Sequence, residues 1–272
     1  MRAINVKPDK AGRVILGVLP FLLVLLAYTI GSGLRLAENP TDKILPAFAT
    51  MGEAIKQYAF MADPRTGDVL LWSDTAATLS RLLAGLAIAT LLALVFGVAI
   101  GMLPVFGSVF GPIVAVASLV PPLALLPILF IMLGLGEGSK IALVVIGTAL
   151  KLIRDMAMRV SDLPREQLIK AQTLGASSSQ IAFRIVIPQI LPRLNDAERL
   201  EIGPAWLFII AAEAIAADSG LGYRIFLVRR YLAMDVIIPY VVWITLLAFL
   251  MDLALRLIQR KAFPWFANGR SA

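Results

Sequence analysis

The chain of 272 residues contains no cysteine and no histidine. Without cysteine it forms neither disulfides nor a thiolate metal site, and without histidine it lacks the commonest general base, metal ligand and pH switch. Charged residues are also scarce, at 16% of the chain against about 25% in soluble proteins. These scarcities exclude a disordered chain, a coiled coil and an ordinary cytosolic enzyme, and no metal site is expected.

Apolar residues take the place of charged ones. They make up 59% of the chain, against about 45–50% in soluble proteins, and the mean hydropathy is +0.85. Residues 82–136 contain no charged side chain. Because a membrane helix needs about 20 residues, this run holds two spans, and Pro104 with the nearby Gly107 and Gly111 predicts the turn between them.

The apolar segments predict an all-α integral membrane protein with a single transmembrane domain over residues 1–272. Six transmembrane helices are expected, near residues 13–31, 77–103, 107–133, 139–160, 198–217 and 236–257. Five is the alternative, in which residues 139–160 do not span. The outer loop 32–75 is too long for a tight turn, and its residues 46–60 have the apolar spacing of a helix lying at the membrane surface.

Lysine and arginine predict the orientation. The chain has 25 of them against 18 acidic residues, which gives a net charge of +7. With the N-terminus inside, the inner segments hold 16 and the outer segments hold 8, the excess that cytoplasmic loops of membrane proteins carry. Both termini and the segment 161–196 are therefore expected in the cytoplasm. This excess of lysine and arginine in cytoplasmic segments accounts for the net charge of +7, so no nucleic-acid partner is expected.

Two features inside the predicted spans are candidates for a transport pathway. Pro121 and Pro122 remove backbone donors at membrane depth, which is tolerated where the backbone is buried in protein or lines a water-filled cavity. Glu213 interrupts an apolar segment, and a carboxylate in a span faces a bundle interior or a cavity. Both also have a structural explanation, in which the prolines kink a helix and Glu213 hydrogen-bonds a neighbouring helix.

Three arginines break the inside-positive trend, because Arg224, Arg229 and Arg230 fall in a predicted outer segment. They are candidates for attracting an anion or for pairing with acidic residues of a partner protein. Contact between an interfacial helix and lipid headgroups is the alternative.

No catalytic site is apparent. The segment GLGEGSK at residues 134–140 looks like a phosphate loop, but Ser139 and Lys140 stand in the wrong order for G-x-x-x-x-G-K-[ST], and the segment lies on the predicted outer side. No carboxylates have catalytic spacing, and no serine has a histidine partner. We therefore expect no enzyme activity and no cofactor in this chain.

Residues 161–196 have the pattern of two short helices rather than of a plain loop. Gly175 can form the left-handed cap of the first helix, and Ser177 with Gln180 forms a capping box for the second, which is expected to stop near Pro188. The apolar residues of this segment are Leu168, Ile169, Leu174, Ile181, Phe183, Ile185 and Val186. That much apolar surface must be covered by a partner protein or by the rest of the chain.

The stretch IKAQTLGASSSQIAFRIVIPQILP, residues 169–192, resembles the signature loop of binding-protein-dependent ABC transporter permeases, in which Glu-Ala-Ala is followed by Gly and later by Ile-x-Leu-Pro. The matching residues are Ala171, Gly175, Ile185 and Pro188, and the departures are Ile169, Lys170 and Ile187. The segments VPPLALLPILFIMLGLGEGSK (120–140) and AAEAIAADSGLGYRIFLVRRYLAMD (211–235) look like the nitrate/sulfonate/taurine-type branch. The resemblance covers about residues 76–265.

This resemblance implies a permease subunit of an ATP-driven importer in the bacterial inner membrane. The implied partners are a second permease copy, a cytoplasmic ATPase dimer that holds ATP and Mg, and an extracytoplasmic solute-binding protein that docks on the outer arginines. Residues 161–196 become the coupling loop that contacts the ATPase, through Leu168, Ile169, Ala171, Gly175, Ala176, Ile185 and Pro188. The implied solutes are small anions such as sulfonates, nitrate or bicarbonate.

Two other functions stay open. An ion-gradient-driven secondary transporter would need paired charges at mid-membrane and usually internal repeats. The sequence offers one deep acid, Glu213, and no convincing repeat. A scaffold subunit without a transport path is the third interpretation.

Overall fold

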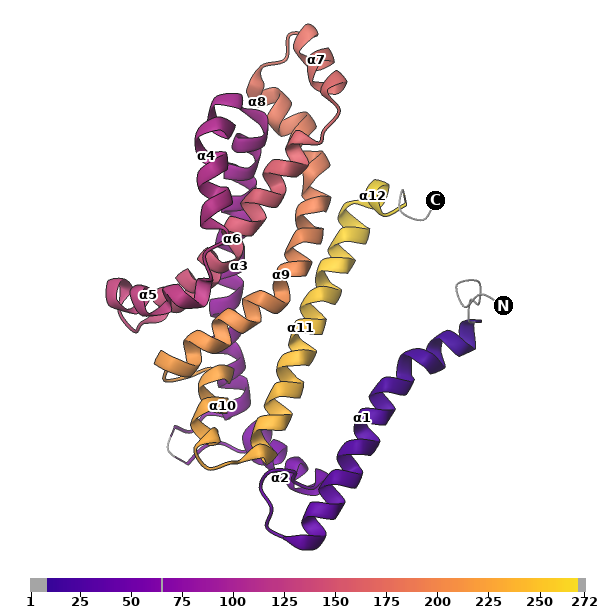
Figure 1. Cartoon of the computed structure of the whole chain (residues 1–272), viewed down its shortest axis with the longest axis vertical. Helices are drawn as coiled ribbons and strands as arrows, with labels where there is room; N and C mark the ends of the chain where they lie inside the picture. The colour runs from indigo at the N-terminus through magenta and orange to yellow at the C-terminus, as the bar shows by residue number, and fades with distance from the viewer. Residues whose placement is uncertain (1–8, 65, 269–272) are drawn as a thin grey trace.

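The protein is described here by a computed structural model that covers residues 9–64 and 66–268. Over these residues the chain is helical and contains no strand, which confirms the predicted all-α class. Four long helices make up most of the bundle in Figure 1: α3 (Leu70–Met102), α6 (Glu137–Ser161), α9 (Ile187–Ala216) and α11 (Met234–Ala262). The predicted cytoplasmic ends of the chain, residues 1–8 and 269–272, lie outside the described residues.

Shorter elements finish the two ends of the bundle (Figure 1). One end carries α7 (Arg165–Thr173) and α8 (Ser178–Ile181), and the other carries α2 (Phe48–Phe60) and α10 (Leu221–Arg229). The remaining elements are α1 (Lys10–Glu38), α4 (Pro104–Ala117), η2 (Pro122–Leu125), α5 (Leu126–Leu133), η3 (Ala182–Val186) and α12 (Pro264–Asn268). Helix α2 confirms that residues 46–60 form a helix, and its place at the membrane surface stays a prediction.

The helix α1 stands apart from the bundle in Figure 1. The most apolar 18-residue window of α1 has no buried residue. Its contacts gather near its C-terminal end, where the Tyr28 hydroxyl donates to Pro46 O at 2.7 Å and the Ser32 hydroxyl donates to Leu45 O at 2.9 Å. Helix α1 is thus anchored at one end and leaves its apolar sides open.

Three described helices, α1, α3 and α11, are long and apolar enough to cross a membrane. Two bent pairs pass the same test when each is taken together, Pro104–Ala117 with Pro122–Leu133 and Ser178–Ala216 with Leu221–Tyr231. The described part of the chain therefore offers three to five spans. Helix α6 is the predicted span that does not qualify, because it carries Glu137, Lys140, Lys151, Arg154, Asp155 and Arg159.

The span predicted over residues 107–133 is sharply bent at its prolines. Helix α4 ends at Ala117, and the chain turns by 86° before it continues as η2 and α5. Pro121 and Pro122 stand at this break, and Pro122 begins η2. A proline supplies no backbone N–H, so a pair of them interrupts the hydrogen-bond ladder of a helix.

The predicted helix stop near Pro188 is also wrong. Helix α8 passes through the π-helical turn η3 directly into α9, and both Pro188 and Pro192 lie within α9. In the π turn the N–H of Ile187 donates to Ala182 O, one residue further back than in an α-helix. This local change lets the helix continue although Pro188 has no N–H to donate.

A seam of small residues joins α3 to α6. The small residues recur at every fourth position of α3: Gly85, Ala89, Ala93, Gly97 and Gly101. A Cβ atom on Gly97 would lie 2.5 Å from Cβ of Met156, and one on Gly85 would lie 2.7 Å from Cβ of Val144. Small residues at this spacing let two backbones approach closely in a membrane.

The two helices of the seam run in the same direction, because α4, η2 and α5 return the chain between them. Gly85 lies against Val144, and Gly101 lies against Val160. The offset between partners is the same at both positions. Each residue of α6 can therefore be placed level with a residue of α3.

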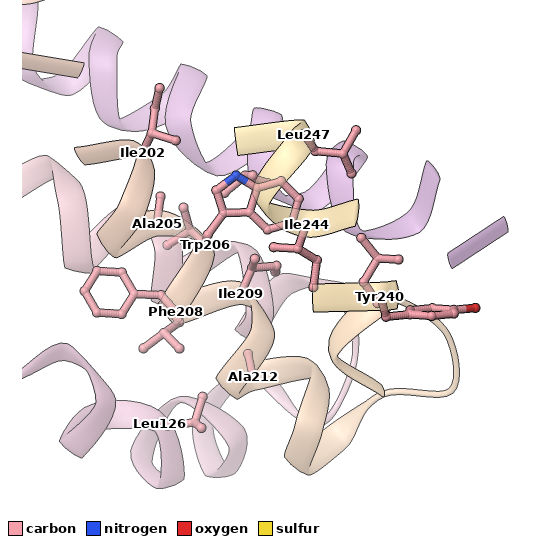
Figure 2. Close-up of a cluster of buried hydrophobic side chains, with 14 of the residues drawn as sticks. Leu126, Ile202, Ala205, Trp206, Phe208, Ile209, Ala212, Tyr240, Ile244 and Leu247 are labelled. Carbon is pink, nitrogen blue, oxygen red and sulfur yellow. The ribbon is translucent and has the colours of Figure 1, made fainter. Parts of the chain in front are cut away.

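The largest core cluster joins α9 to α11, and Figure 2 shows its side chains. The labelled residues of α9 are Ile202, Ala205, Trp206, Phe208, Ile209 and Ala212, and those of α11 are Tyr240, Ile244 and Leu247. All of them are buried. This contact fixes α9, which carries Glu213 at its far end.

Candidate functional site

A buried polar cluster lies where α3, α9 and α10 meet. It consists of Asp74, Thr78 and Arg81 from α3, Glu213 from α9 and Arg224 from α10. Glu213 is fully buried and Arg81 is 5% exposed. The guanidinium of Arg81 donates from Nη1 to Glu213 Oε1 at 2.7 Å, and the hydroxyl of Thr78 lies 2.9 Å from both oxygens of Glu213. The carboxylate therefore has a charged partner on a neighbouring helix.

The same cluster closes the N-terminus of α10. The first backbone N–H groups of a helix have no partner within it. Here Gly220 N donates to Asp74 Oδ1 at 3.0 Å, and Leu221 N donates to the Thr78 hydroxyl at 2.8 Å. Gly222 N donates to Glu213 Oε2 at 2.9 Å. Side chains of two other helices thus hold the turn between α9 and α10.

Arg81 also extends the cluster to α6. Its Nη2 donates to Glu137 Oε1 at 2.9 Å, its Nε is bonded to the other oxygen of Glu137, and Lys140 Nζ donates to Glu137 at 3.0 Å. The side chain of Glu137 is 57% exposed, whereas that of Arg81 is 6% exposed. One guanidinium therefore links a buried carboxylate to one at the surface.

These contacts bear on the two interpretations of Glu213. The carboxylate is bonded on both oxygens to neighbouring elements and is sealed from the surface. This arrangement favours the structural explanation. The break at Pro121 and Pro122 differs, because Pro121 is exposed and Pro122 is half-buried. A pathway role for these three residues stays a prediction.

The predicted docking arginines fall into two groups. Arg224 turns into the protein, where its Nε donates to Asp74 Oδ2 at 2.8 Å and its side chain is 15% exposed. Its charge is already paired, so the expectation that Arg224 faces a partner protein is not supported. Arg229 and Arg230 are exposed, and the guanidinium of Arg229 lies 4.8 Å from the ring centre of Phe226. These two stay candidates for docking.

The segment 161–196 carries the caps that were predicted for it. Gly175 has a φ of +80° between α7 and α8. Gly175 N donates to Gln172 O at 2.9 Å and Ala176 N donates to Ala171 O at 3.0 Å, the two bonds of a Schellman motif. Ser177 and Gln180 form the reciprocal capping box that opens α8. The capping hydrogen bonds of this turn thus come from residues of the segment itself.

Part of the apolar surface of this segment is covered by the chain itself. Ile181 and Val186 are buried in a cluster with Val98, Val160 and Ile190, and Leu168, Ala171 and Ala176 pack against it in part. Of the predicted coupling residues, Ile169, Gly175 and Pro188 are exposed and Ile185 is half-buried. The predicted coupling residues therefore lie on two sides of the loop. One side packs against the rest of the chain, and the other, which we call the open side, is exposed.

The most exposed apolar residues of the segment were missing from the predicted coupling set. The side chain of Leu174 is 80% exposed and that of Phe183 is 71% exposed, against 56% for Ile169. They had counted only as part of the general apolar surface. The feature that marks these two residues is their position in the chain. Leu174 directly precedes the left-handed glycine, and Phe183 lies in the π turn.

Comparisons with known proteins decide the family. Residues 85–264 match the family described as binding-protein-dependent transport system inner membrane component. The taurine transport system permease protein TauC of Escherichia coli (strain K12) is 35% identical over 198 residues, which are 73% of this chain and 72% of that protein. The bicarbonate transport system permease protein CmpB of Synechocystis sp. is 27% identical over 254 residues, 92% of this chain and 88% of that protein.

The chain belongs to this family of permeases. It is the membrane-spanning permease subunit of an ABC transporter, as the resemblance implied, and an ion-gradient-driven secondary transporter is not favoured. ATP hydrolysis in such a transporter belongs to a separate ATPase subunit. The nitrate/sulfonate/taurine branch is supported by TauC and CmpB and by the nitrate import permease protein NrtB of Synechocystis sp., which is 26% identical over 69% of this chain and 68% of that protein.

A solved structure has the same fold. The inward-facing MetNI methionine ABC transporter contains a chain that covers 70% of this chain, with 93% of its own length aligned, at a TM-score of 0.56 and 19% identity. At that identity the likeness speaks for the fold alone. The permease arrangement of helices therefore extends over most of the described residues.

Several polar residues of the permease were missed by sequence reasoning. The sequence pattern indicates Glu213 as the single deep acid, yet α9 holds two more half-buried acids, Glu198 bonded to Thr90 and Glu201 beside Lys151. The partners of Glu213 were missed as well, because Thr78 and Arg81 lie 135 and 132 residues away in sequence. Their signal was weak, since only the seam of small residues on α3 shows which face of that helix meets the others.

Proposed function

We propose that this permease works as a homodimer with a cytoplasmic ATPase dimer and an extracytoplasmic binding protein, and imports a small acidic solute. The family supports an importer that uses these kinds of partner. The solute class rests on the relatives, whose names specify taurine and bicarbonate. In this proposal α6 is the sixth span, both termini are cytoplasmic, and the α7–α8 end of the bundle faces the ATPase.

The coupling loop, residues 161–196, carries this proposal. It combines a rigid helix–glycine–helix turn with exposed apolar side chains at Ile169, Leu174 and Phe183. Exposed apolar patches on an otherwise folded surface mark sites of protein contact. Closure of the ATPase dimer would pull on this loop and rotate the attached helices as rigid bodies between two states. Elements α8, η3 and α9 follow one another without a gap. Because no flexible linker separates them, this continuity supports such a transfer.

The substitution Gly175→Val tests this role. A residue with a Cβ atom in the left-handed conformation costs about 1–2 kcal/mol, too little to unfold the bundle. We expect normal permease abundance, poor association with the ATPase and no stimulation of ATP hydrolysis by the loaded binding protein. Binding and stimulation are measured with the purified complex.

Gly67→Val is the matched control. Gly67 also has a positive φ, of +76°, and like Gly175 has open space around it, but it lies between α2 and α3 at the other end of the molecule. The backbone strain is therefore similar while the coupling loop is untouched. Full coupling in Gly175→Val, or equal loss in both variants, would remove the coupling role from this loop.

A further inference from the structure

Helix α6 carries charge at a depth where its neighbour carries none. Residues 82–102 of α3 contain no charged side chain, and the constant register of the seam places Lys151 level with Leu92, the middle of that stretch. A charged side chain at the centre of a membrane is costly unless it faces a protein interior or a water-filled space. The side chain of Lys151 is 43% exposed, so this lysine is not sealed within its own subunit.

The surroundings of Lys151 are specific. Its Nζ lies 3.8 Å from Glu201 Oε2 and 5.9 Å from the ring centre of Phe208, both on α9. The Phe208 ring is held against Gly147, one helical turn before Lys151, where an added Cβ would lie 2.4 Å from the ring. The three side chains thus form one site between two helices that pack closely.

The pair of charges is incompletely satisfied. A charge-assisted hydrogen bond between nitrogen and oxygen is about 2.7–2.9 Å long, and the 3.8 Å between Lys151 and Glu201 exceeds this. Glu201 Oε2 is buried and accepts no hydrogen bond within the described part of the chain. An acceptor and a donor therefore stand side by side, each with capacity for another partner.

We infer that Lys151 and Glu201 form a mid-membrane site for a small zwitterionic solute, with the acidic group of the solute at Lys151 and its ammonium group at Glu201. The inference rests on the proposed transport function and narrows its solute class. A simple anion such as nitrate would satisfy Lys151 but leave Glu201 facing a negative charge. An amino acid or aminosulfonate satisfies both, and the face of Phe208 also attracts a cation.

The first test asks whether the site faces water. Because the chain has no cysteine, a single Lys151→Cys substitution can be labelled with a water-soluble, negatively charged methanethiosulfonate in the complex with ATPase and binding protein. The control is Leu250→Cys, an exposed position on α11. We expect position 151 to react about tenfold faster, because lipid excludes a charged reagent. Equal rates would overturn the inference.

The second test asks which charge each residue recognises. Uptake of taurine is compared with uptake of isethionate, a sulfonate with a hydroxyl in place of the ammonium group, in proteoliposomes that hold the complete transporter. Glu201→Gln should lower the ratio of taurine to isethionate uptake about tenfold, the effect of losing a charged hydrogen bond. Comparing ratios between variants cancels the preference of the binding protein. Lys151→Gln should lower uptake of both solutes, and Lys151→Arg should restore it.

Controls separate this site from a general effect and from the proposed function. Arg154→Gln removes the same charge about one turn further along α6. If this variant loses as much uptake as Lys151→Gln, the effect comes from the general positive potential of α6 and not from a specific site. If Glu201→Gln lowers the uptake of taurine and of isethionate equally, Glu201 has a structural role and does not recognise the ammonium group. If the wild-type transporter moves neither taurine nor any amino acid of a standard panel, the zwitterionic class is wrong. ATP hydrolysis stimulated by the binding protein then shows whether the transport function itself still holds.

Discussion

The two ends of the bundle are finished in opposite ways. At the α10 end, the N–H groups of Gly220, Leu221 and Gly222 donate to side chains of α3 and α9, and Glu213 is fully buried. At the α7–α8 end, the loop caps its own helices through bonds between neighbours in sequence and leaves Leu174 and Phe183 exposed. The turn at the first end is held by side chains that are distant in sequence, whereas the turn at the second end is capped by its own neighbours and its helices pack on the bundle through Ile181 and Val186.

The two ends are therefore suited to different roles, one to joining helices and the other to binding a partner protein. A buried charge is tolerated only when its partners hold it in place, and the polar cluster links α3, α9 and α10 at this end. A self-capped loop keeps its shape while its open side binds another protein. Force applied to the coupling loop would then reach the far end of the bundle through rigid helices.

Loss of the buried carboxylate should have the largest effect. Glu213→Ala leaves Arg81 without its buried partner and removes the acceptor for Gly222 N, and breaking such a pair costs about 3–5 kcal/mol. We expect a strongly lowered thermal unfolding temperature of the purified permease, with a smaller loss in Glu213→Gln, which keeps one acceptor. Glu53→Ala on the exposed surface of α2 is the control. An unchanged unfolding temperature in Glu213→Ala would mean that the cluster does not hold this end together.

The seam between α3 and α6 should be the next most sensitive region. A side chain on Gly97 would meet Met156 at 2.5 Å, and overpacking of this kind costs about 1–3 kcal/mol. Gly97→Val should therefore lower the unfolding temperature, whereas Gly17→Val on α1, with no atom within 4 Å, should not. Equal effects in the two variants would show that the close approach of the helices does not matter.

Local features of the sequence predicted the caps within residues 161–196. The left-handed Gly175 and the capping box of Ser177 and Gln180 depend on residues within a few positions of each other. The failure at Pro188 has the opposite cause, since a π turn can absorb the missing N–H and sequence patterns do not show when it will. A proline predicts a break only when the neighbouring backbone cannot adjust.

Contacts between distant segments could not be predicted. Asp74 and Arg224 were both visible as charges, but their pairing joins residues 150 positions apart. The sequence pattern assigns no role to Lys151. Its position level with Leu92 of α3 and its neighbour Glu201 follow from the packing of α3, α6 and α9, which requires the folded structure.

The exposed arginines at the α10 end should give a smaller effect. If Arg229 and Arg230 steer the binding protein, replacing both with Gln should weaken docking about two- to thirtyfold, because each exposed ion pair contributes about 0.2–1 kcal/mol. The loss should shrink at high salt, since exposed charges are screened beyond about 8–10 Å at physiological ionic strength. Docking affinity is measured at two salt concentrations, with the pair Lys43→Gln and Lys56→Gln as control. Unchanged affinity would leave lipid headgroup contact as the explanation.

The open side of the coupling loop tests the account most directly. Leu174→Asp and Phe183→Asp place a charge on exposed side chains, so folding should be unaffected, and Trp265→Asp is a control on α12, where the side chain is 62% exposed. We predict that each loop variant binds the purified ATPase about tenfold more weakly at an unchanged unfolding temperature, as expected when a central apolar contact is lost at an interface. The control should bind normally. ATPase binding at full affinity in both loop variants would contradict the proposal that this end of the permease is the coupling surface.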